Sequence, residues 1–168
     1  AARGARSMAF EPVEATFADL NANVVVNKIE HLVRTSRLAI GREPGELRFT
    51  TTQDTTNHVA HGNDTEALQV VHVDSLDRQL ADEAPTVLKI DVEGWEQEVL
   101  NGAGSTLAKA SLLAVILELN GSGARYGFDD GQTHQLMLAA GFQPHRYAPF
   151  ERRLIDLGAS HNRSGNTL

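Results

Sequence analysis

At Lys89-Ile90-Asp91-Val92-Glu93-Gly94-Trp95-Glu96 the sequence passes from an apolar run, Thr86-Val87-Leu88, to a helical pattern that continues through Leu100. This order predicts a buried strand that delivers two carboxylates, Asp91 and Glu93, to a strand–helix turn. In open α/β sheets, ligands bind at the carboxyl ends of the strands. We therefore expect Asp91 and Glu93 to lie where the chemistry takes place.

Composition restricts the classes of function. The chain has 168 residues, enough for one domain with a substantial core. Lys and Arg total 15 against 22 for Asp and Glu, a net charge of −7, which argues against a nucleic-acid partner but not against a small anionic ligand. The absence of cysteine excludes disulfides and thiolate metal sites. No apolar run approaches the ~20 residues that cross a bilayer, and no signal peptide is visible, so we predict a cytoplasmic protein without a membrane partner.

Strands and helices alternate along the chain. The patterns predict strands at 7–10, 38–40, 86–91 and 112–119, and a closing hairpin of 142–147 with 153–157. Weak alternation at 47–49 and 70–73 predicts edge or hairpin strands. They predict helices at 13–27, at 76–80 with Asp74 as the cap, at 96–100 and at 134–140. Such alternation implies an α/β fold with a mostly parallel sheet. Right-handed crossovers then place Glu11, Ile40, Asp91 and the Glu118–Asn120 segment on one edge. We expect residues 1–159 to form one domain and 160–168 to be a polar C-terminal tail.

Several short motifs lie on either side of residues 89–96. Each motif alone is a weak signal for a protein family, but their order along the chain is more specific. In chain order they are Phe10-Glu11-Pro12, the pair Asn23 and Asn27, Asn57-His58, the segments 71–77, 89–94 and 100–103, and Ile116-Leu117-Glu118. This ordered set, over about residues 10–147, resembles the FkbM family of S-adenosylmethionine-dependent methyltransferases. The resemblance implies a Rossmann-like class I methyltransferase sheet, mostly parallel with a C-terminal antiparallel strand. It also implies S-adenosylmethionine as cofactor and O-methylation of a small molecule, a sugar or a natural product.

One part of the family pattern is missing. The family begins with a strand and a glycine-rich turn of the type Asp-x-Gly-Ala-Asn-x-Gly, which cradles the methionine part of the cofactor. No such motif precedes Phe10. We therefore expect the first strand and helix to be absent, and the isolated chain to bind the cofactor poorly.

Glu11 is the candidate for holding the cofactor ribose. A carboxylate at a strand end can accept both ribose hydroxyls, as in dinucleotide folds. Pro12 favours an extended conformation at Glu11, and Ala39, Ile40 and Asp91 complete the expected cofactor side. The alternative for Glu11 is a solvated acid at a strand end.

Four residues are candidates for the reaction itself: Asp91, Glu93, His58 and Lys89. Removing the proton of a substrate hydroxyl needs a general base, either His58 or Asp91, or a divalent ion held by carboxylates. Lys89 shares a strand face with Asp91, which predicts a buried charge pair. Structural alternatives are that Asp91 caps the next helix and that Glu93 is an acid in the first turn of that helix.

The substrate side is assigned to Asn57, Glu118 and Asn120. Glu118 interrupts an apolar strand, so we expect it to pair with Lys89 or to reach the cleft. Trp95 is interpreted as core or as a pocket wall.

A metal site is not predicted. His58 and His61 lie near Asp54 and Asp64, but a solvated polar loop is the preferred interpretation. Two other functions stay open: a nucleotide-binding α/β oxidoreductase, and a non-catalytic fragment. Titration with S-adenosylmethionine and with NAD separates them from the methyltransferase.

Overall fold

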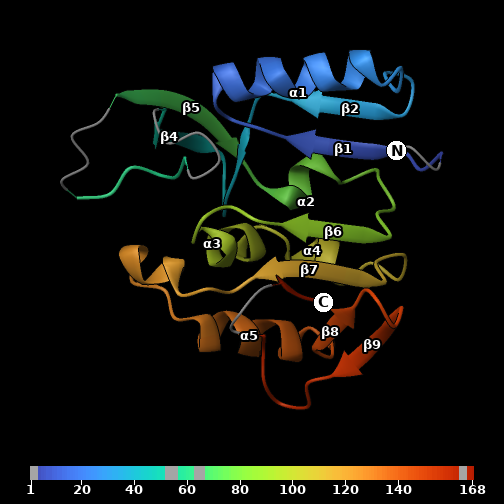
Figure 1. Ribbon diagram of the computed structural model, residues 1–168. Coiled ribbons are helices and arrows are strands. Elements are labelled where there is room, and N and C mark those ends of the chain that lie inside the picture. The colour runs from blue at the N-terminus through green and yellow to red at the C-terminus, as the bar shows by residue number, and fades with distance from the viewer. Residues whose placement is uncertain (1–3, 52–56, 63–66, 163–165) are drawn as a thin grey trace. The chain divides into compact units, whose positions relative to one another are not determined.

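The computed structural model describes residues 4–51, 57–62, 67–162 and 166–168. The chain divides into two compact units, Ala1–Asp74 and Ser75–Leu168. The described residues of both units contain short strands and α-helix (Figure 1), so the predicted α/β class is confirmed.

The first unit begins with a β-α-β segment. Strand β1 (Ser7–Phe10) is followed by helix α1 (Glu14–Val26) and strand β2 (Val33–Ser36). β1 and β2 pair in parallel, and α1 lies along this pair (Figure 1). The sequence predicted β1 and α1 but not β2. The residues Val33-Arg34-Thr35-Ser36 carry no apolar run, so nothing in their local pattern marked them as a strand.

A small mixed sheet completes the first unit. It consists of β3 (Ala39–Ile40), β4 (Gly45–Thr50) and β5 (Leu68–Asp74), in the order β3-β5-β4. β5 pairs in parallel with β3 and in antiparallel fashion with β4, so the two segments predicted as edge or hairpin strands pair with each other. Ala39, Val71 and Val73 are buried together, with Leu47 and Phe49 packed against them.

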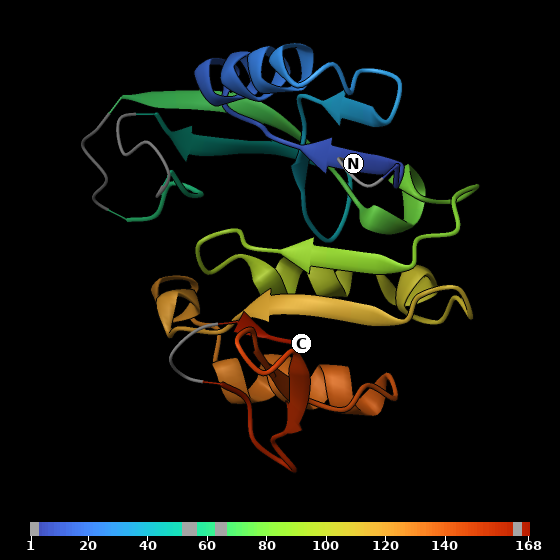
Figure 2. The same cartoon turned by 45° about the vertical axis from the view of Figure 1, so that its right-hand side comes forward.

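The second unit is built on two parallel strands. It contains α2 (Leu76–Gln79), β6 (Val87–Ile90), α3 (Glu96–Asn101), α4 (Gly104–Leu107) and β7 (Ala114–Glu118). β6 and β7 run side by side in the same direction, as Figure 2 shows, with Ile90 opposite Leu117. The predicted cap of α2 is wrong: Ser75, not Asp74, is the N-cap, because its hydroxyl accepts a hydrogen bond from the backbone N–H of Arg78.

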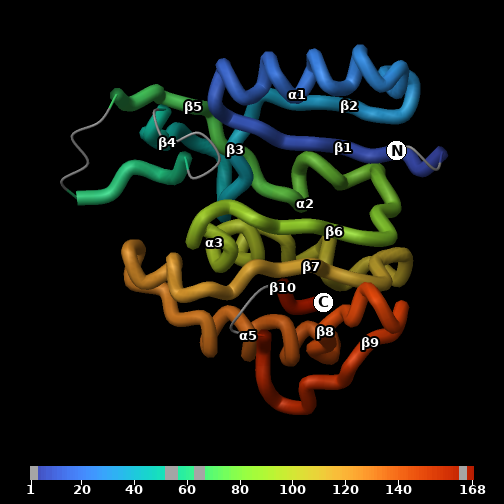
Figure 3. Tube along the Cα trace, viewed as in Figure 1, coloured from blue at the N-terminus to red at the C-terminus, as the bar shows by residue number. Residues whose placement is uncertain are grey.

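The rest of this unit returns to β7. After the 3-10 helix η2 (Ser122–Tyr126) come α5 (Asp130–Ala139) and the predicted hairpin of β8 (His145–Ala148) and β9 (Arg153–Asp156). Within the segment predicted as a polar tail, β10 (Asn166–Thr167; labelled in Figure 3) pairs antiparallel with β7. The next residue, Leu168, exchanges two backbone hydrogen bonds with His145. β10 therefore lies between β7 and β8.

The strands of the described residues form four small sheets: β1-β2, β3-β5-β4, β10-β7-β6 and β8-β9. Parallel and antiparallel pairs both occur, so a single Rossmann-like, mostly parallel sheet stays a prediction. Among the helices in the described ranges, none is long and apolar enough to cross a membrane.

Candidate functional site

Three acidic side chains meet where β6 and β7 end. We call Asp91, Glu93 and Glu118 the carboxylate cluster; each offers one oxygen, and these oxygens lie within 4.8 Å of one another. The parallel register explains the meeting: Ile90 lies opposite Leu117, so the next residues, Asp91 and Glu118, also fall side by side. Oxygens of this kind are the ligands that Mg²⁺ and Ca²⁺ take.

Lys89 contacts the cluster from β6. Its Nζ lies 2.5 Å from Oδ2 of Asp91, as the shared strand face required. The side chains of Lys89 and Asp91 are 55% and 35% exposed, so the predicted burial of this ion pair is wrong. The hydrogen bond from Lys89 is the main reason that the pKa of Asp91 is lowered, because the ammonium favours the charged carboxylate.

Asp91 and Glu118 are hydrogen-bonded to each other. The bond to Asp91 is the main reason that the pKa of Glu118 is raised, followed by burial and by the charges of Asp91, Glu93 and Glu96. Two adjacent carboxylates resist double ionisation, so one proton is held between them to a higher pH than usual. Glu118 was expected to pair with Lys89 or reach the cleft; its described partner is Asp91, and Lys89 contacts Asp91 instead.

The turn after β6 has an unusual backbone. The N–H of Trp95 donates to the carbonyl of Val92 at 3.3 Å, and the two residues between them, Glu93 and Gly94, have φ angles of +54° and +100°. Positive φ at both central positions is typical of a type I′ turn. Helix α3 begins only at Glu96, with Trp95 at its N-cap position. The two structural alternatives, Asp91 as cap and Glu93 in the first helical turn, are therefore wrong.

Two contacts hold this turn, and the sequence predicted neither. The buried carboxylate of Glu96 accepts hydrogen bonds from the N–H groups of Val92 and Gly94, at 3.1 and 3.3 Å. Gly94 also packs against the backbone of Ser122: a Cβ at Gly94 would lie 2.6 Å from the carbonyl carbon of Ser122. The acid at position 96 and the glycine at 94 were visible in the motif, but their partners were not.

An aromatic group adjoins the turn. The ring of Trp95 lies 5.0 Å from that of Tyr126 and 5.9 Å from that of Phe128, both in edge-to-face contacts. Its Nε1 is buried and has no hydrogen-bond partner within the described part of the chain. Nearby, Oδ1 of Asn120 accepts from the N–H of Ser122 at 3.0 Å, so this predicted substrate residue also shapes its own loop.

Glu11 follows β1 in the first unit. Its Oε1 accepts from the N–H of Val13 at 2.8 Å, and its carboxylate has no further partner among the described residues. Burial raises the pKa of Glu11, an effect that this hydrogen bond reduces. The second oxygen is thus available to a hydroxyl donor such as a ribose. Among the other predicted cofactor residues, Pro12 and Ile40 are half-buried and Ala39 is buried.

His58 and Asn57 also belong to the first unit. His58 is only 6% exposed, and its backbone N–H donates to the hydroxyl of Thr50 at 3.0 Å, so the solvated interpretation is wrong for His58. His61 is exposed, as expected. The hydroxyl of Thr50 donates to Oδ1 of Asn57 at 3.4 Å. The acids at 54 and 64 lie outside the described residues. The base role of His58 and the substrate role of Asn57 stay predictions.

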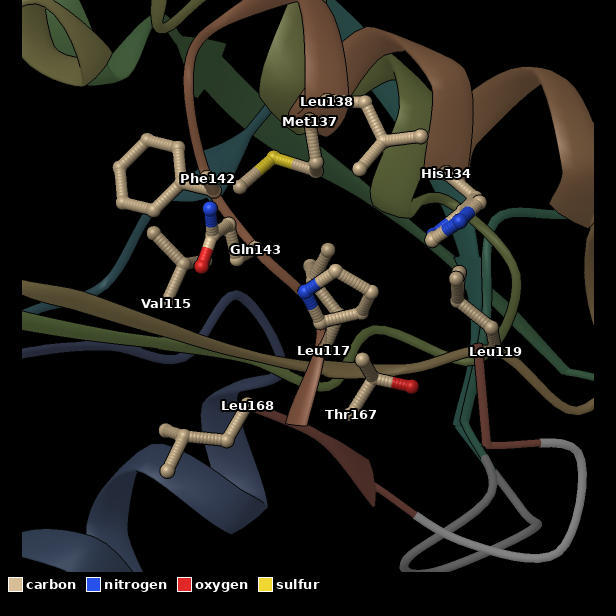
Figure 4. A pocket seen from close by; sticks show the side chains of 11 residues that line it. Val115, Leu117, Leu119, His134, Met137, Leu138, Phe142, Gln143, Thr167 and Leu168 are labelled. Carbon is tan, nitrogen blue, oxygen red and sulfur yellow. The ribbon is translucent and has the colours of Figure 1, made fainter. Parts of the chain in front are cut away.

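An apolar pocket lies beside α5 in the second unit (Figure 4). It measures about 360 Å³, including space open to solvent. Its walls are Val115, Leu117, Leu119, His134, Met137, Leu138, Phe142, Gln143, Pro144, Thr167 and Leu168. Successive side chains of a strand point to opposite faces, so Leu117 and Leu119 face the pocket while Glu118, between them, faces away. The pocket is thus separate from the carboxylate cluster.

Comparison with known proteins agrees with the motifs. A family model described as the methyltransferase FkbM domain matches residues 1–144. The crystal structure of methyltransferase FkbM from Methylobacillus flagellatus KT is similar, with a TM-score of 0.57 and 14% sequence identity, over 96% of this chain and 35% of that one. At this identity the likeness shows the fold alone, and the chain spans about a third of that protein's length. No curated protein sequence matches.

Proposed function

The chain belongs to the FkbM methyltransferase family, and from this premise we propose that it takes part in transferring a methyl group from S-adenosylmethionine to a hydroxyl group of a small molecule. The observation that carries the proposal is the carboxylate cluster at the ends of two parallel strands, where the neighbouring Asp91 raises the pKa of Glu118. Ligands of α/β sheets bind at such strand ends. A sugar or natural product as substrate rests on the family resemblance and stays a prediction, as does a cytoplasmic location.

The described residues fit one part of the cofactor. S-adenosylmethionine supplies an electrophilic methyl group on its sulfonium. Glu11 would hold the ribose, since its carboxylate is half-buried and has an oxygen without a partner among the described residues. Ala39 and Ile40, in the short strand β3, would contact the same part of the cofactor. We assign no residue to its methionine end.

The cluster then handles the proton of the substrate. As the hydroxyl oxygen forms its bond to the methyl carbon and the carbon–sulfur bond breaks, the hydroxyl proton must pass to a base. We assign this role to Glu118 in the ionised pair, because a raised pKa makes a carboxylate a stronger base near neutral pH. Asp91, held by Lys89, orients Glu118, and Glu93 accepts a hydrogen bond from the substrate.

The test combines binding with turnover in the full-length protein. Isothermal titration with S-adenosylmethionine and with NAD comes first; binding of NAD alone would favour an oxidoreductase, and binding of neither would favour a non-catalytic protein. Transfer of a labelled methyl group is then measured for Glu118→Gln, which keeps the shape but cannot accept the proton. We expect turnover to fall at least about tenfold.

Glu98→Gln is the matched control, because Glu98 lies in α3 and contacts Asn101 through its Oε1. It should leave turnover within about twofold of wild type, the scale of a surface substitution. Glu118→Gln with normal turnover and a normal pH profile would remove Glu118 from the mechanism.

A further inference from the structure

The turn that follows β6 is held from inside by one side chain. Glu96 is 5% exposed, and its Oε1 accepts hydrogen bonds from two N–H groups of that turn, those of Val92 and Gly94. The residue between these two donors is Glu93, a member of the carboxylate cluster. The contacts of Glu96 therefore bracket a residue whose carboxylate lies beside Asp91 and Glu118.

The backbone of Glu93 needs such support. Its φ of +54° is a left-handed conformation, which an L-residue adopts only at a cost in free energy. Residues held this way persist where their surroundings determine the conformation. Both neighbouring N–H groups donate to the same carboxyl oxygen, so the turn cannot change shape without breaking one of these hydrogen bonds.

Stability alone does not explain an acid at position 96. Burial is the main reason that the pKa of Glu96 is raised, and the backbone hydrogen bonds that favour its charged form do not cancel that effect. The folded protein thus disfavours the charged form of this side chain. A buried acid that is kept despite this penalty is better explained by what its two acceptor contacts hold in place.

We propose that Glu96 is a positioning residue of the carboxylate cluster: its buried carboxylate fixes the Val92–Trp95 turn in the shape that sets Glu93 beside Asp91 and Glu118. The proposal rests on the methyl-transfer function given above, because it assigns Glu96 a role in that reaction. Glu96 touches no reacting atom and acts only through the turn.

The test compares variants of the full-length protein. Glu96→Ala removes the acceptor, whereas Glu96→Gln keeps an amide oxygen that can accept from Val92 and Gly94. Glu98→Ala is the control in the same helix. In Glu96→Ala we expect kcat per folded molecule to fall at least about tenfold, since small displacements of reacting groups cost that much or more, while KM for S-adenosylmethionine stays within about twofold. Glu96→Gln should recover kcat to within about threefold of wild type.

A second measurement does not depend on activity. Amide hydrogen exchange at Val92 and Gly94, followed by NMR, should be at least about tenfold faster in Glu96→Ala and unchanged in Glu96→Gln and Glu98→Ala. If Glu96→Ala does not fold, Glu96→Asp replaces it, because its carboxylate is one methylene shorter and cannot reach both donors.

The outcomes separate the positioning role of Glu96 from the proposed methyl-transfer function. Faster exchange with a normal kcat, or unchanged exchange, overturns the positioning role of Glu96. If the wild-type protein transfers no methyl group, the proposed function fails, and the exchange rates still decide whether Glu96 holds the turn.

Discussion

Replacing Gly94 by alanine should disrupt the turn between β6 and α3. Alanine would have to adopt a φ near +100°, and its Cβ would lie 2.6 Å from the carbonyl carbon of Ser122 and 2.8 Å from the backbone nitrogen of Gly123. These two atoms and the third close neighbour, the carbonyl oxygen of Ser122 at 2.7 Å, are all backbone atoms, so no flexible side chain can move aside. Either the turn or the Ser122–Gly123 segment must shift.

Two terms contribute to the loss of stability expected for Gly94→Ala. A left-handed conformation costs an L-residue about 1–2 kcal/mol. The 2.6 Å contact is about 0.8 Å shorter than the 3.4 Å at which ordinary contact begins, and overpacking of this kind costs about 1–3 kcal/mol. Together these terms predict a loss of about 2–5 kcal/mol in the free energy of unfolding, or roughly 4–20 °C in Tm for a chain of this length.

The assay is urea unfolding followed by tryptophan fluorescence. The chain contains one tryptophan, Trp95, which directly follows Gly94, so the signal reports on this turn. Gly141→Ala is the matched control: its φ is +91°, but nothing lies within 4 Å of the position of its Cβ. The control should lose only the conformational part, about 1–2 kcal/mol.

The stability of Gly94→Ala relative to Gly141→Ala and to wild type decides whether these two terms exist. If Gly94→Ala and Gly141→Ala lose the same stability, the close approach of Gly94 to Ser122 contributes nothing, and the second contact that holds the turn does not exist in solution. If Gly94→Ala is as stable as wild type, the left-handed conformation is also wrong.

Two further predictions concern the second unit. Asp77 accepts hydrogen bonds from the N–H of Ser105 (2.9 Å) and from the N–H and hydroxyl of Thr106 (2.7 and 2.8 Å), so Asp77→Ala should cost about 1–2 kcal/mol by urea unfolding, the scale of a lost helix cap. Burial raises the pKa of Asp77, but these hydrogen bonds outweigh it and leave the pKa lowered. The stability that ionised Asp77 contributes is therefore present above the usual pKa of 3.8 and is lost as pH falls through the lower pKa of the folded state. A stability difference between Asp77→Ala and wild type that persists at still lower pH would contradict this. Because Glu118 is assigned as the base, EDTA should leave the methyl-transfer rate within about twofold; a large loss that Mg²⁺ restores would instead make the carboxylate cluster a cation site.

Much of the fold was predictable from local patterns. The run before Asp91 predicted β6, and the spacing of Val13, Phe17, Leu20 and Val24 predicted α1. The closing hairpin of β8 and β9 was also predicted, and weak alternation marked β4 and β5 as edge or hairpin strands. These signals are local because a helix or a strand buries one face at a fixed period. β2 and β10 escaped prediction because their residues are mostly polar and their pairing partners, β1 and β7, lie elsewhere in the chain.

Part of the candidate site was also predictable from the sequence, and part depends on the folded structure. Parallel strand ends share an edge, and this rule predicted Asp91 and Glu118 on one edge of the sheet, but not that the two carboxyl groups would be neighbours. The raised pKa of Glu118, the buried hydrogen bonds of Glu96 and the close approach of Gly94 to Ser122 depend on distances of a few ångströms, which local sequence patterns do not give. Hydrogen bonds and close packing are short-range, so these features of the site emerge only when the chain has folded.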